Sequence, residues 1–204
     1  MVEHTNEVQA TEVDARSALL TAATRLFASQ GYSATGVQQI TDAANVNKAM
    51  LYYYFGSKEQ LYAALIAEGI TSIEGAVAQA MQPGLSLEER LRAFLTHYLA
   101  QVAHHPELAR IIYREIVGAG EHTRQTVIDH FSESIHQLAA ILSEAQHQHE
   151  LREIDATLSA YTLIGMANIF ISSFFVTGRC LDLSPTIEHI VDLFLHGAGR
   201  QALA

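Results

Sequence analysis

Apolar residues recur at intervals of three and four along most of this chain, which is the spacing of amphipathic helices. The first such stretch places five apolar residues on one face: Leu19, Ala22, Ala23, Leu26 and Phe27. No strand-like alternation and no internal repeat stand out, and three prolines in 204 residues leave long stretches free to be helical. The pattern therefore predicts an all-α fold of about nine helices.

Helix start signals are frequent, and several have the spacing of a capping box. These pairs are Thr11 with Asp14, Thr35 with Gln38, Ser57 with Gln60, and Ser86 with Glu89. Asn47 is placed to cap a further helix, and Ser184 followed by Pro185 is placed to start the last one. Together with breaks at Pro83-Gly84 and His105-Pro106, the signals predict helices over about 11–30, 35–44, 48–54, 58–81, 86–104, 107–117, 121–149, 155–177 and 184–197.

Three regions follow from this organisation. Residues 1–12 are mostly polar and lack a period, so they are expected to form a disordered acidic leader. Residues 13–58 are expected to form a three-helix domain. Its core is predicted where the first helix packs against Ile40, Val46, Leu51 and Phe55. Residues 59–204 are expected to form a larger helical body.

Composition limits the class of protein. A hydrophobic content of 49% is enough to bury a full core. The lone Cys180 cannot form an internal disulfide, and no apolar signal segment stands near the N-terminus, so a cytoplasmic location is expected. The longest apolar stretch, Leu163 to Val176, is interrupted by glycine and polar residues. It is predicted to be too short and too polar to cross a membrane.

The charge distribution changes the interpretation of the total charge. A net charge of −10 argues at first against nucleic acid, because phosphate contacts need lysine or arginine. Residues 1–14, 15–58 and 59–204, however, carry −4, +3 and −9. Positive charge is therefore concentrated in the predicted three-helix domain, where a duplex would be attracted while the rest of the chain repels it.

Both lysines of the chain lie in residues 35–58, together with the run Tyr52, Tyr53 and Tyr54. A short helix, a turn at 45–47 and a second short helix with cationic and phenolic side chains are typical of a helix-turn-helix. In that motif the second helix enters the major groove of DNA. The segment therefore predicts a DNA-binding domain.

The segment GYSATGVQQITDAANVNKAMLYYYFGSKEQLYAAL resembles the N-terminal signature of the TetR family of bacterial transcriptional regulators. The matching positions are Gly31-Tyr32, Ala34-Thr35, Val37, Ile40, Ala43-Ala44, Val46, Leu51-Tyr52, Tyr54-Phe55, Ser57-Lys58 and Leu61. The resemblance covers roughly residues 15–65. The remaining helices agree with that family's all-helical regulatory body in number and length only.

Two positions depart from the family pattern. Gly36 stands where a Thr or Ser able to bond a phosphate is frequent, which would weaken one backbone contact with DNA. Asn45 stands where a glycine usually makes the turn. Because asparagine tolerates the left-handed conformation, the turn is expected to be kept.

Resemblance and helix geometry together imply seven DNA-binding residues: Thr35, Gln38, Lys48, Ala49, Tyr52, Tyr53 and Lys58. Lys48 is expected to donate to guanine O6 and N7, and Ala49 to meet a thymine methyl group. Tyr52, Tyr53 and Lys58, with the start of the second helix, are expected to hold phosphates. Tyr54 and Phe55 are expected to pack inward. The alternative is that all three tyrosines are packing residues.

One small module buries too little surface for tight specific binding, so a homodimer on a palindromic operator is expected. Its half-sites would lie roughly 34 to 36 Å apart, or a multiple of that distance. The last two helices are the candidate dimer surface because small residues there alternate with apolar ones. These are Leu163, Ile164, Gly165, Ala167, Ile169, Ser172, Ser173, Phe174, Phe175, Ile187, Ile190, Val191, Phe194 and Leu195. The alternative is that they fill the monomer's own core.

The resemblance also implies that a small molecule bound in the body moves the fourth helix and alters the separation of the two DNA-binding domains. Candidate pocket residues are His97, Tyr98, Tyr113, Arg114, His130 and His136, with Phe131, Met166 and Phe170 as apolar lining. The alternative for each is an ordinary core or surface residue, which is the more frequent role of such side chains. The identity of the effector stays open.

No metal or other cofactor is expected. The histidines that cluster in sequence are His104, His105, His122, His147 and His149, and none has the helical pair spacing of a zinc site. Cys180 is a poor candidate for a redox sensor, because Asp182 opposes the effect of the neighbouring Arg179 on the thiolate.

The leading interpretation is a ligand-responsive transcriptional repressor. An architectural DNA-binding protein with no effector is the first alternative. A helical-bundle enzyme or lipid carrier is the second. The chain has no Gly-rich phosphate loop, nucleophile elbow or zinc motif, so enzymatic activity is not expected.

Overall fold

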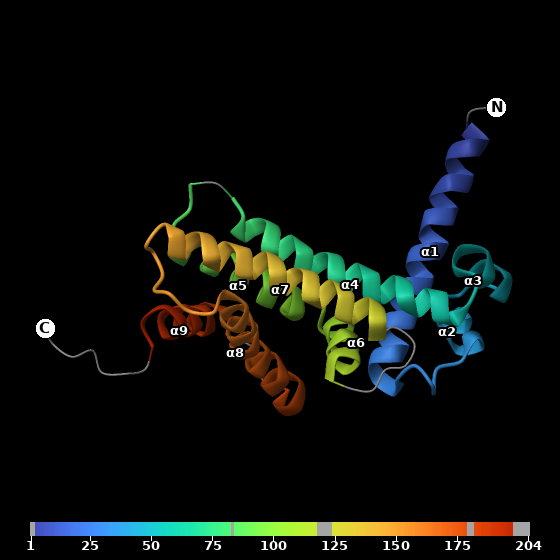
Figure 1. The fold of residues 1–204 in the computed structure, drawn as a ribbon. Coiled ribbons are helices and arrows are strands. Elements are labelled where there is room, and N and C mark those ends of the chain that lie inside the picture. The colour runs from blue at the N-terminus through green and yellow to red at the C-terminus, as the bar shows by residue number, and fades with distance from the viewer. Residues whose placement is uncertain (1–2, 83, 118–123, 179–181, 198–204) are drawn as a thin grey trace, which may run out of the picture. The chain divides into compact units, whose positions relative to one another are not determined.

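The computed structural model describes the backbone of residues 3–82, 84–117, 124–178 and 182–197. Side chains are described over the same ranges except at 3–14, 72–73, 116–117 and 124–130. The described residues form nine α-helices and no strand, which confirms the all-α prediction (Figure 1). In chain order the helices are α1 (Glu3–Gln30), α2 (Val37–Ala43), α3 (Lys48–Phe55), α4 (Lys58–Ala80), α5 (Leu87–His104), α6 (Pro106–Val117), α7 (Arg124–His147), α8 (Ala156–Thr177) and α9 (Leu183–His196).

Several predicted helix ends are confirmed by their hydrogen bonds. The Ser57 hydroxyl accepts a hydrogen bond from Gln60 N at 3.1 Å and so caps the start of α4. At the start of α5, the Ser86 hydroxyl accepts from Glu89 N, and the Glu89 carboxylate accepts from Ser86 N at 2.9 Å. The hydrogen bond from Ser86 N and a second one from the Ser86 hydroxyl, at 2.8 Å, lower the pKa of Glu89. Helix α5 ends at His104, directly before the predicted break.

The first and last helices begin earlier than the sequence predicts. Helix α1 begins at Glu3, so residues 3–12 are helical and are not the expected disordered leader. Helix α9 begins at Leu183 with Asp182 in the N-cap position, which places Ser184 inside the first turn. Thr11 and Ser184 therefore lie inside α1 and α9 and do not cap the start of these helices.

The chain divides into two compact units that differ from the predicted division after residue 58. Unit 1 comprises residues 1–69 and 107–127, and unit 2 comprises residues 70–106 and 128–204. Helix α6 and the first half of α4 therefore belong with the three-helix domain. The boundary between the units falls inside α4, after Gly69.

Unit 1 has an apolar core that the sequence largely predicts. Its buried side chains in α1 to α3 are Leu19, Ala22, Ala23, Phe27, Ile40, Leu51 and Phe55, while Leu26 and Val46 are half-buried. Helices α4 and α6 complete the core with Leu61, Tyr62, Leu65, Ile66, Ile111 and Ile112. A Cβ atom on Gly69 would lie 1.9 Å from Cδ1 of Ile112, so this glycine allows α6 to approach α4 closely.

Unit 2 is built around contacts of α5 with α8 and α9, and of α8 with α9. Its buried side chains there are Leu91, Phe94, Leu95, Leu99, Leu163, Ile164, Ala167, Ile187, Ile190 and Val191. Polar contacts fix the ends of the elements. The Glu150 carboxylate accepts from Leu87 N at 2.6 Å, and Arg90 pairs with Glu144 at 2.8 Å.

Candidate nucleic-acid interface

The turn between α2 and α3 has the geometry that a helix-turn-helix requires. Asn45 has a φ of 54°, which confirms the prediction that asparagine replaces glycine in a left-handed turn. Its N–H donates to the carbonyl of Asp42 at 3.1 Å. Asn47 Oδ1 accepts from Met50 N at 3.0 Å and so starts α3, as the sequence predicts.

The outward face of α3 carries four of the predicted DNA-binding residues. They are Lys48, Ala49, Tyr52 and Tyr53, all of them exposed. Tyr52 is 51% exposed and Tyr53 71%, so the alternative in which all three tyrosines pack into the core is wrong. Leu51 and Phe55 form the buried face of α3, and Tyr54 is half-buried with its ring edge-on to that of Tyr53 at 5.0 Å.

Gln38 is exposed on α2, as a residue that meets DNA must be. Its amide nitrogen donates to Asp42 Oδ1 at 2.5 Å, one helical turn further along. The amide is therefore held in one orientation by a residue of the same helix.

Thr35 is not on the surface. It is 1% exposed, its hydroxyl donates to the carbonyl of Gly31 at 2.7 Å, and it accepts from Gln30 Nε2 at 3.3 Å. Gly36 takes the N-cap position of α2, where Gln39 Oε1 accepts from Gly36 N at 2.7 Å. The prediction that the Thr35 side chain starts α2 and faces DNA is therefore wrong, because its hydroxyl is used inside the loop.

Lys58 is also bound within the protein. Its ammonium group donates to the carbonyls of Tyr32 at 3.0 Å and Thr35 at 2.9 Å. The same nitrogen lies 4.1 Å from the centre of the Tyr32 ring, a cation–π contact. The structure thus gives Lys58 partners inside the protein, whereas the sequence predicts that it holds a phosphate.

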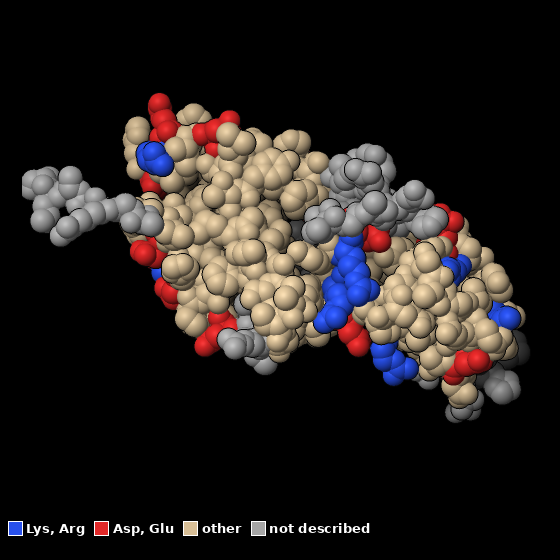
Figure 2. All heavy atoms as spheres, turned by 90° about the horizontal axis from the view of Figure 1, so that it is seen from below, with Lys and Arg blue, Asp and Glu red and all other residues tan. Residues whose placement is uncertain are grey.

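Figure 2 shows one face of the molecule, on which basic and acidic side chains are scattered among wide areas that carry neither.

Helix α8 exposes an apolar stripe. Its exposed members are Leu158, Tyr161, Ile169 and Val176, spaced by about whole turns of the helix, with Gly165 exposed between them. A Cβ atom on Gly165 would have no neighbour within 4 Å. Of these stripe residues, only Gly165 and Ile169 belong to the predicted dimer surface. Six members of that surface fill the core of unit 2 instead: Leu163, Ile164, Ala167, Ile187, Ile190 and Val191. We call the exposed set, with Gly165, the α8 stripe.

The predicted ligand-binding residues do not all belong to one unit. Tyr113 and Arg114 are in unit 1, where Arg114 is exposed with Nη1 3.5 Å from the carbonyl of Phe27. His97, Tyr98, Phe131, Met166 and Phe170 are in unit 2. His136 is exposed, and the side chain of His130 lies outside the described residues.

Tyr98 is the most deeply placed of these candidates. It is buried, its hydroxyl donates to Asn168 Oδ1 at 2.8 Å, and its ring stacks on that of Phe94 at 5.7 Å. Burial raises the pKa of Tyr98 to about 12. This pair joins α5 to α8 by a polar contact inside unit 2.

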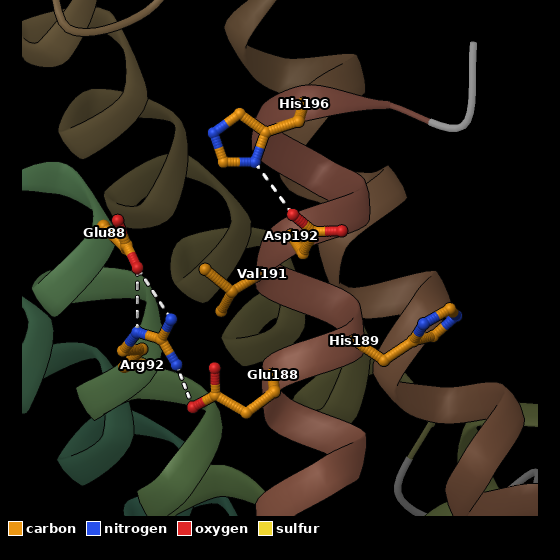
Figure 3. Close-up of a pocket in the computed structure, with 7 residues that line it drawn as sticks. All are labelled: Glu88, Arg92, Glu188, His189, Val191, Asp192 and His196. Carbon is orange, nitrogen blue, oxygen red and sulfur yellow. Dashed lines mark hydrogen bonds and ion pairs between the residues drawn. The ribbon is translucent and has the colours of Figure 1, made fainter. Parts of the chain in front are cut away.

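A surface hollow of about 380 Å³ lies between α5 and α9 (Figure 3). Arg92 there pairs with Glu88 at 2.6 Å and with Glu188, so both carboxylates already have a cationic partner. His196 lies 3.1 Å from Asp192, and His189 points away from Arg92. Over the described part of the chain, no group of three or more metal-ligating side chains is found. His122 and Cys180 lie outside it.

Comparison with known proteins decides which family this arrangement belongs to. The model of the bacterial regulatory proteins of the tetR family matches residues 19–65. The model of the tetracyclin repressor-like C-terminal domain matches residues 84–198, more than half of the chain. This chain belongs to the TetR family. The resemblance of the N-terminal segment is thereby extended over the helical body.

Individual TetR-family relatives match this chain over most of their own length. The HTH-type transcriptional repressor NicS of Pseudomonas putida is 28% identical over 81% of this chain and 80% of its own. The structure of AibR in complex with isovaleryl coenzyme A and operator DNA is 28% identical, covers 89% and 98% of the two chains and has a TM-score of 0.72. PfmR of Thermus thermophilus is 26% identical over 89% and 99%, with a TM-score of 0.76. NicS is named as a transcriptional repressor and PfmR as a TetR-family transcriptional regulator.

Two helices of this TetR-family protein, α4 and α8, are long and apolar enough to cross a membrane by length and composition. Helix α8 is longer than the stretch Leu163 to Val176 that the sequence analysis considered. About half of the apolar part of α4 is buried and 28% of that of α8. Core helices of soluble proteins pass the same test, so these two helices are weak evidence for a membrane location.

One polar contact in unit 1 was not predicted. Tyr62 is buried in α4, its hydroxyl donates to Glu115 Oε1 of α6 at 2.6 Å, and its ring lies edge-on to that of Phe27 at 5.0 Å. Burial and this hydrogen bond raise the pKa of Tyr62. The partners are 53 residues apart, so no local pattern connects them.

Proposed function

We propose that this TetR-family regulator is a repressor that binds a palindromic operator as a homodimer and is released by a small-molecule effector. One observation carries the DNA-binding part. Helix α3 buries Leu51 and Phe55 and exposes Lys48, Ala49, Tyr52 and Tyr53, which presents a cation, a methyl group and two phenols to a major groove.

Within this surface the residues have different roles. Lys48, in the first turn of α3, reads a guanine, and Ala49 meets a thymine methyl group. Tyr52, Tyr53 and Gln38 hold phosphates and fix the register. We expect Lys48→Ala to change the preferred base at one position by roughly 1 to 3 kcal/mol. Binding-site selection on the wild type and the variant measures this, and identical sequence preferences would refute base reading by Lys48.

The α8 stripe is the proposed dimer contact. It combines exposed apolar side chains with a glycine that lets a second helix approach. A twofold dimer places two α3 helices in successive major grooves, roughly 34 to 36 Å apart or a multiple of that. Ile169→Glu puts a charge in the middle of the stripe and is expected to give monomers in sedimentation experiments. The exposed Glu133→Lys change is the control, and a dimeric Ile169→Glu protein would exclude this surface.

An acyl-coenzyme A is the proposed class of effector. Support comes from AibR, a relative that covers nearly the whole chain and whose structure holds isovaleryl coenzyme A with operator DNA. The repressor role is supported by the likeness to NicS. In this chain the polar Tyr98–Asn168 pair of unit 2, with Met166 and Phe170 on the same helix as Asn168, is the proposed contact region.

The test uses DNA recovered by binding-site selection. Isovaleryl coenzyme A, free coenzyme A and free isovalerate are added separately to the complex. The proposal expects release by the thioester at concentrations where the other two have no effect, since both halves of the molecule contribute to binding. If a broad panel of acyl-coenzyme A thioesters releases nothing and many genomic sites bind equally, the architectural alternative is favoured.

A further inference from the structure

The loop between α1 and α2, residues 31–36, is closed by hydrogen bonds from α1 and α2. The buried Thr35 hydroxyl donates to Gly31 O and accepts from Gln30 Nε2. The amide nitrogen of Gln30 also lies 3.4 Å from Gln39 Oε1, which in turn accepts from Gly36 N. These contacts fix the last residue of α1 to the first turn of α2.

Lys58, which lies after α2 and α3 in the sequence, binds the same loop. Its ammonium is within 3.0 Å of two loop carbonyls, those of Tyr32 and Thr35, and sits over the Tyr32 ring. Lys58 is the first residue of α4, where the helix dipole disfavours a positive charge. The two carbonyls and the aromatic ring supply the negative potential that keeps the cation there.

An ammonium group has three N–H donors. Two of them are used by the loop carbonyls, and the nitrogen already faces the ring. Moving Lys58 outward to a phosphate would remove charge-assisted hydrogen bonds from the Thr35 carbonyl, whose residue is buried. A phosphate contact is therefore in competition with the structure of the loop.

We propose that Lys58 is a positioning residue for DNA binding: it ties the first turn of α4 to the α1–α2 loop and stays there when DNA binds. Its effect on affinity arises because the loop sets the start of α2, including the exposed Gly36 and Gln38, before DNA arrives. This inference rests on the proposal that α2 and α3 face DNA.

The first test uses the unaltered protein, because Lys48 and Lys58 are its only lysines. With carbon-13-labelled lysine, the ε-methylene signals of these two residues are assigned with Lys48→Met. The Tyr32 ring is expected to shift the Lys58 signal upfield. On addition of a mixed-sequence duplex, the Lys48 signal should move and the Lys58 signal should keep its ring-current shift.

The outcomes separate the two proposals. If Lys48 responds to DNA while Lys58 loses its upfield shift, the positioning role is overturned and the DNA-binding face stands. If Lys48 does not respond, the proposed DNA-binding face fails, and the inference about Lys58 fails with it.

The second test is the salt dependence of binding to the same duplex. Lys58→Met keeps the apolar stem and removes the charge. It is expected to weaken binding about tenfold at every salt concentration, because an unfixed loop must be ordered on binding. The slope of log affinity against log salt should equal that of the wild type. A slope smaller in magnitude by about 0.9 would show a lost phosphate contact and overturn the inference, as would an unchanged affinity.

A direct readout of the loop completes the test. In Lys58→Met, amide hydrogen exchange at Thr35 and Gly36 is expected to become faster, while exchange in the buried part of α1 around Leu19 stays slow. The matched variant Lys48→Met should leave the loop amides as in the wild type. Unchanged loop exchange in Lys58→Met would contradict the proposal.

Discussion

The α1–α3 part of unit 1 and the α5–α8–α9 part of unit 2 are stabilised differently. In unit 1, the short helices α2 and α3 and the loop before α2 are held by polar side chains bound to backbone groups: Asn47 to Met50 N, Thr35 to Gly31 O and Lys58 to two loop carbonyls. In unit 2, long helices pack through apolar side chains, and the ion pairs of Arg92 lie at the surface. The comparison indicates that α2 and α3 depend on polar contacts with backbone groups in addition to the apolar core of unit 1, whereas the α5–α8–α9 part of unit 2 is stabilised mainly by apolar packing.

The largest expected effect is on the core of unit 1. Phe27 is 1% exposed and contacts the rings of Tyr32 and Tyr62, so Phe27→Ala should lower the free energy of unfolding by about 3 to 5 kcal/mol. Urea denaturation measures this. Leu91→Ala is the counterpart in unit 2 and should cost about 2 to 5 kcal/mol without changing the DNA affinity of the folded protein. A loss below about 1 kcal/mol for Phe27→Ala would contradict this description of the core.

The buried polar pair of unit 2 gives the next effect. Tyr98→Phe removes the hydrogen bond to Asn168 and should cost about 1 to 3 kcal/mol at neutral pH. Because burial raises the pKa of Tyr98 from 10.0 to about 12, its protonated form stabilises the fold below pH 10. That stabilisation is lost as the pH rises through about 12. Unfolding curves across this range should fall more steeply for the wild type than for Tyr98→Phe, and parallel curves would refute the assignment.

Two helix caps, Asn47 in unit 1 and Ser86 in unit 2, allow the two units to be compared through a smaller change in stability. Asn47→Ala and Ser86→Ala should each cost about 1 kcal/mol, because each removes one side-chain acceptor from a helix start. Only Asn47→Ala should also weaken DNA binding, since α3 begins there. Asn47→Asp, which keeps an acceptor, is the control for the cap. Equal DNA affinities for the two alanine variants would remove the distinction between the units.

The smallest effect is expected at the surface of unit 2. Arg92→Met breaks the pairs with Glu88 and Glu188, but these groups are solvated and salt screens them. The Arg92 hydrogen bond lowers the pKa of Glu188, so its small stabilisation is present above the ordinary glutamate pKa and disappears as the pH falls. The midpoint of unfolding should change less than in Asn47→Ala. A larger change would show that this ion pair is more important than its exposure indicates.

The local structure of unit 1 could be predicted because its signals are local. Asn45 in the turn, Asn47 and Ser57 as caps, and the exposed α3 residues all follow from neighbours within four positions. Thr35 was misplaced because Gly36, one residue later, takes the cap. The partners of Lys58 lie 23 and 26 residues away, so only the folded chain brings them together.

The candidate sites of unit 2 were less predictable for the same reason. The sequence pattern of α9 does not distinguish an apolar residue that faces the unit's own core from one that faces a second subunit. For this reason Ile187 and Ile190 were assigned to a dimer surface, although both are buried within a single chain. The contacts of Tyr62 with Glu115 and of Tyr98 with Asn168 span 53 and 70 residues. Helical periodicity gives the direction of a side chain on its own helix, but not its partner.

The position of the unit boundary inside α4 has a mechanical consequence. The 23 residues of this helix form a rod about 34 Å long, whose hydrogen-bond ladder resists stretching and compression. Any displacement passed along it must therefore take the form of a tilt, a rotation about the helix axis or a bend. Lys58 stands at one extremity of that rod, so such a movement would pull directly on the carbonyls to which it is bound.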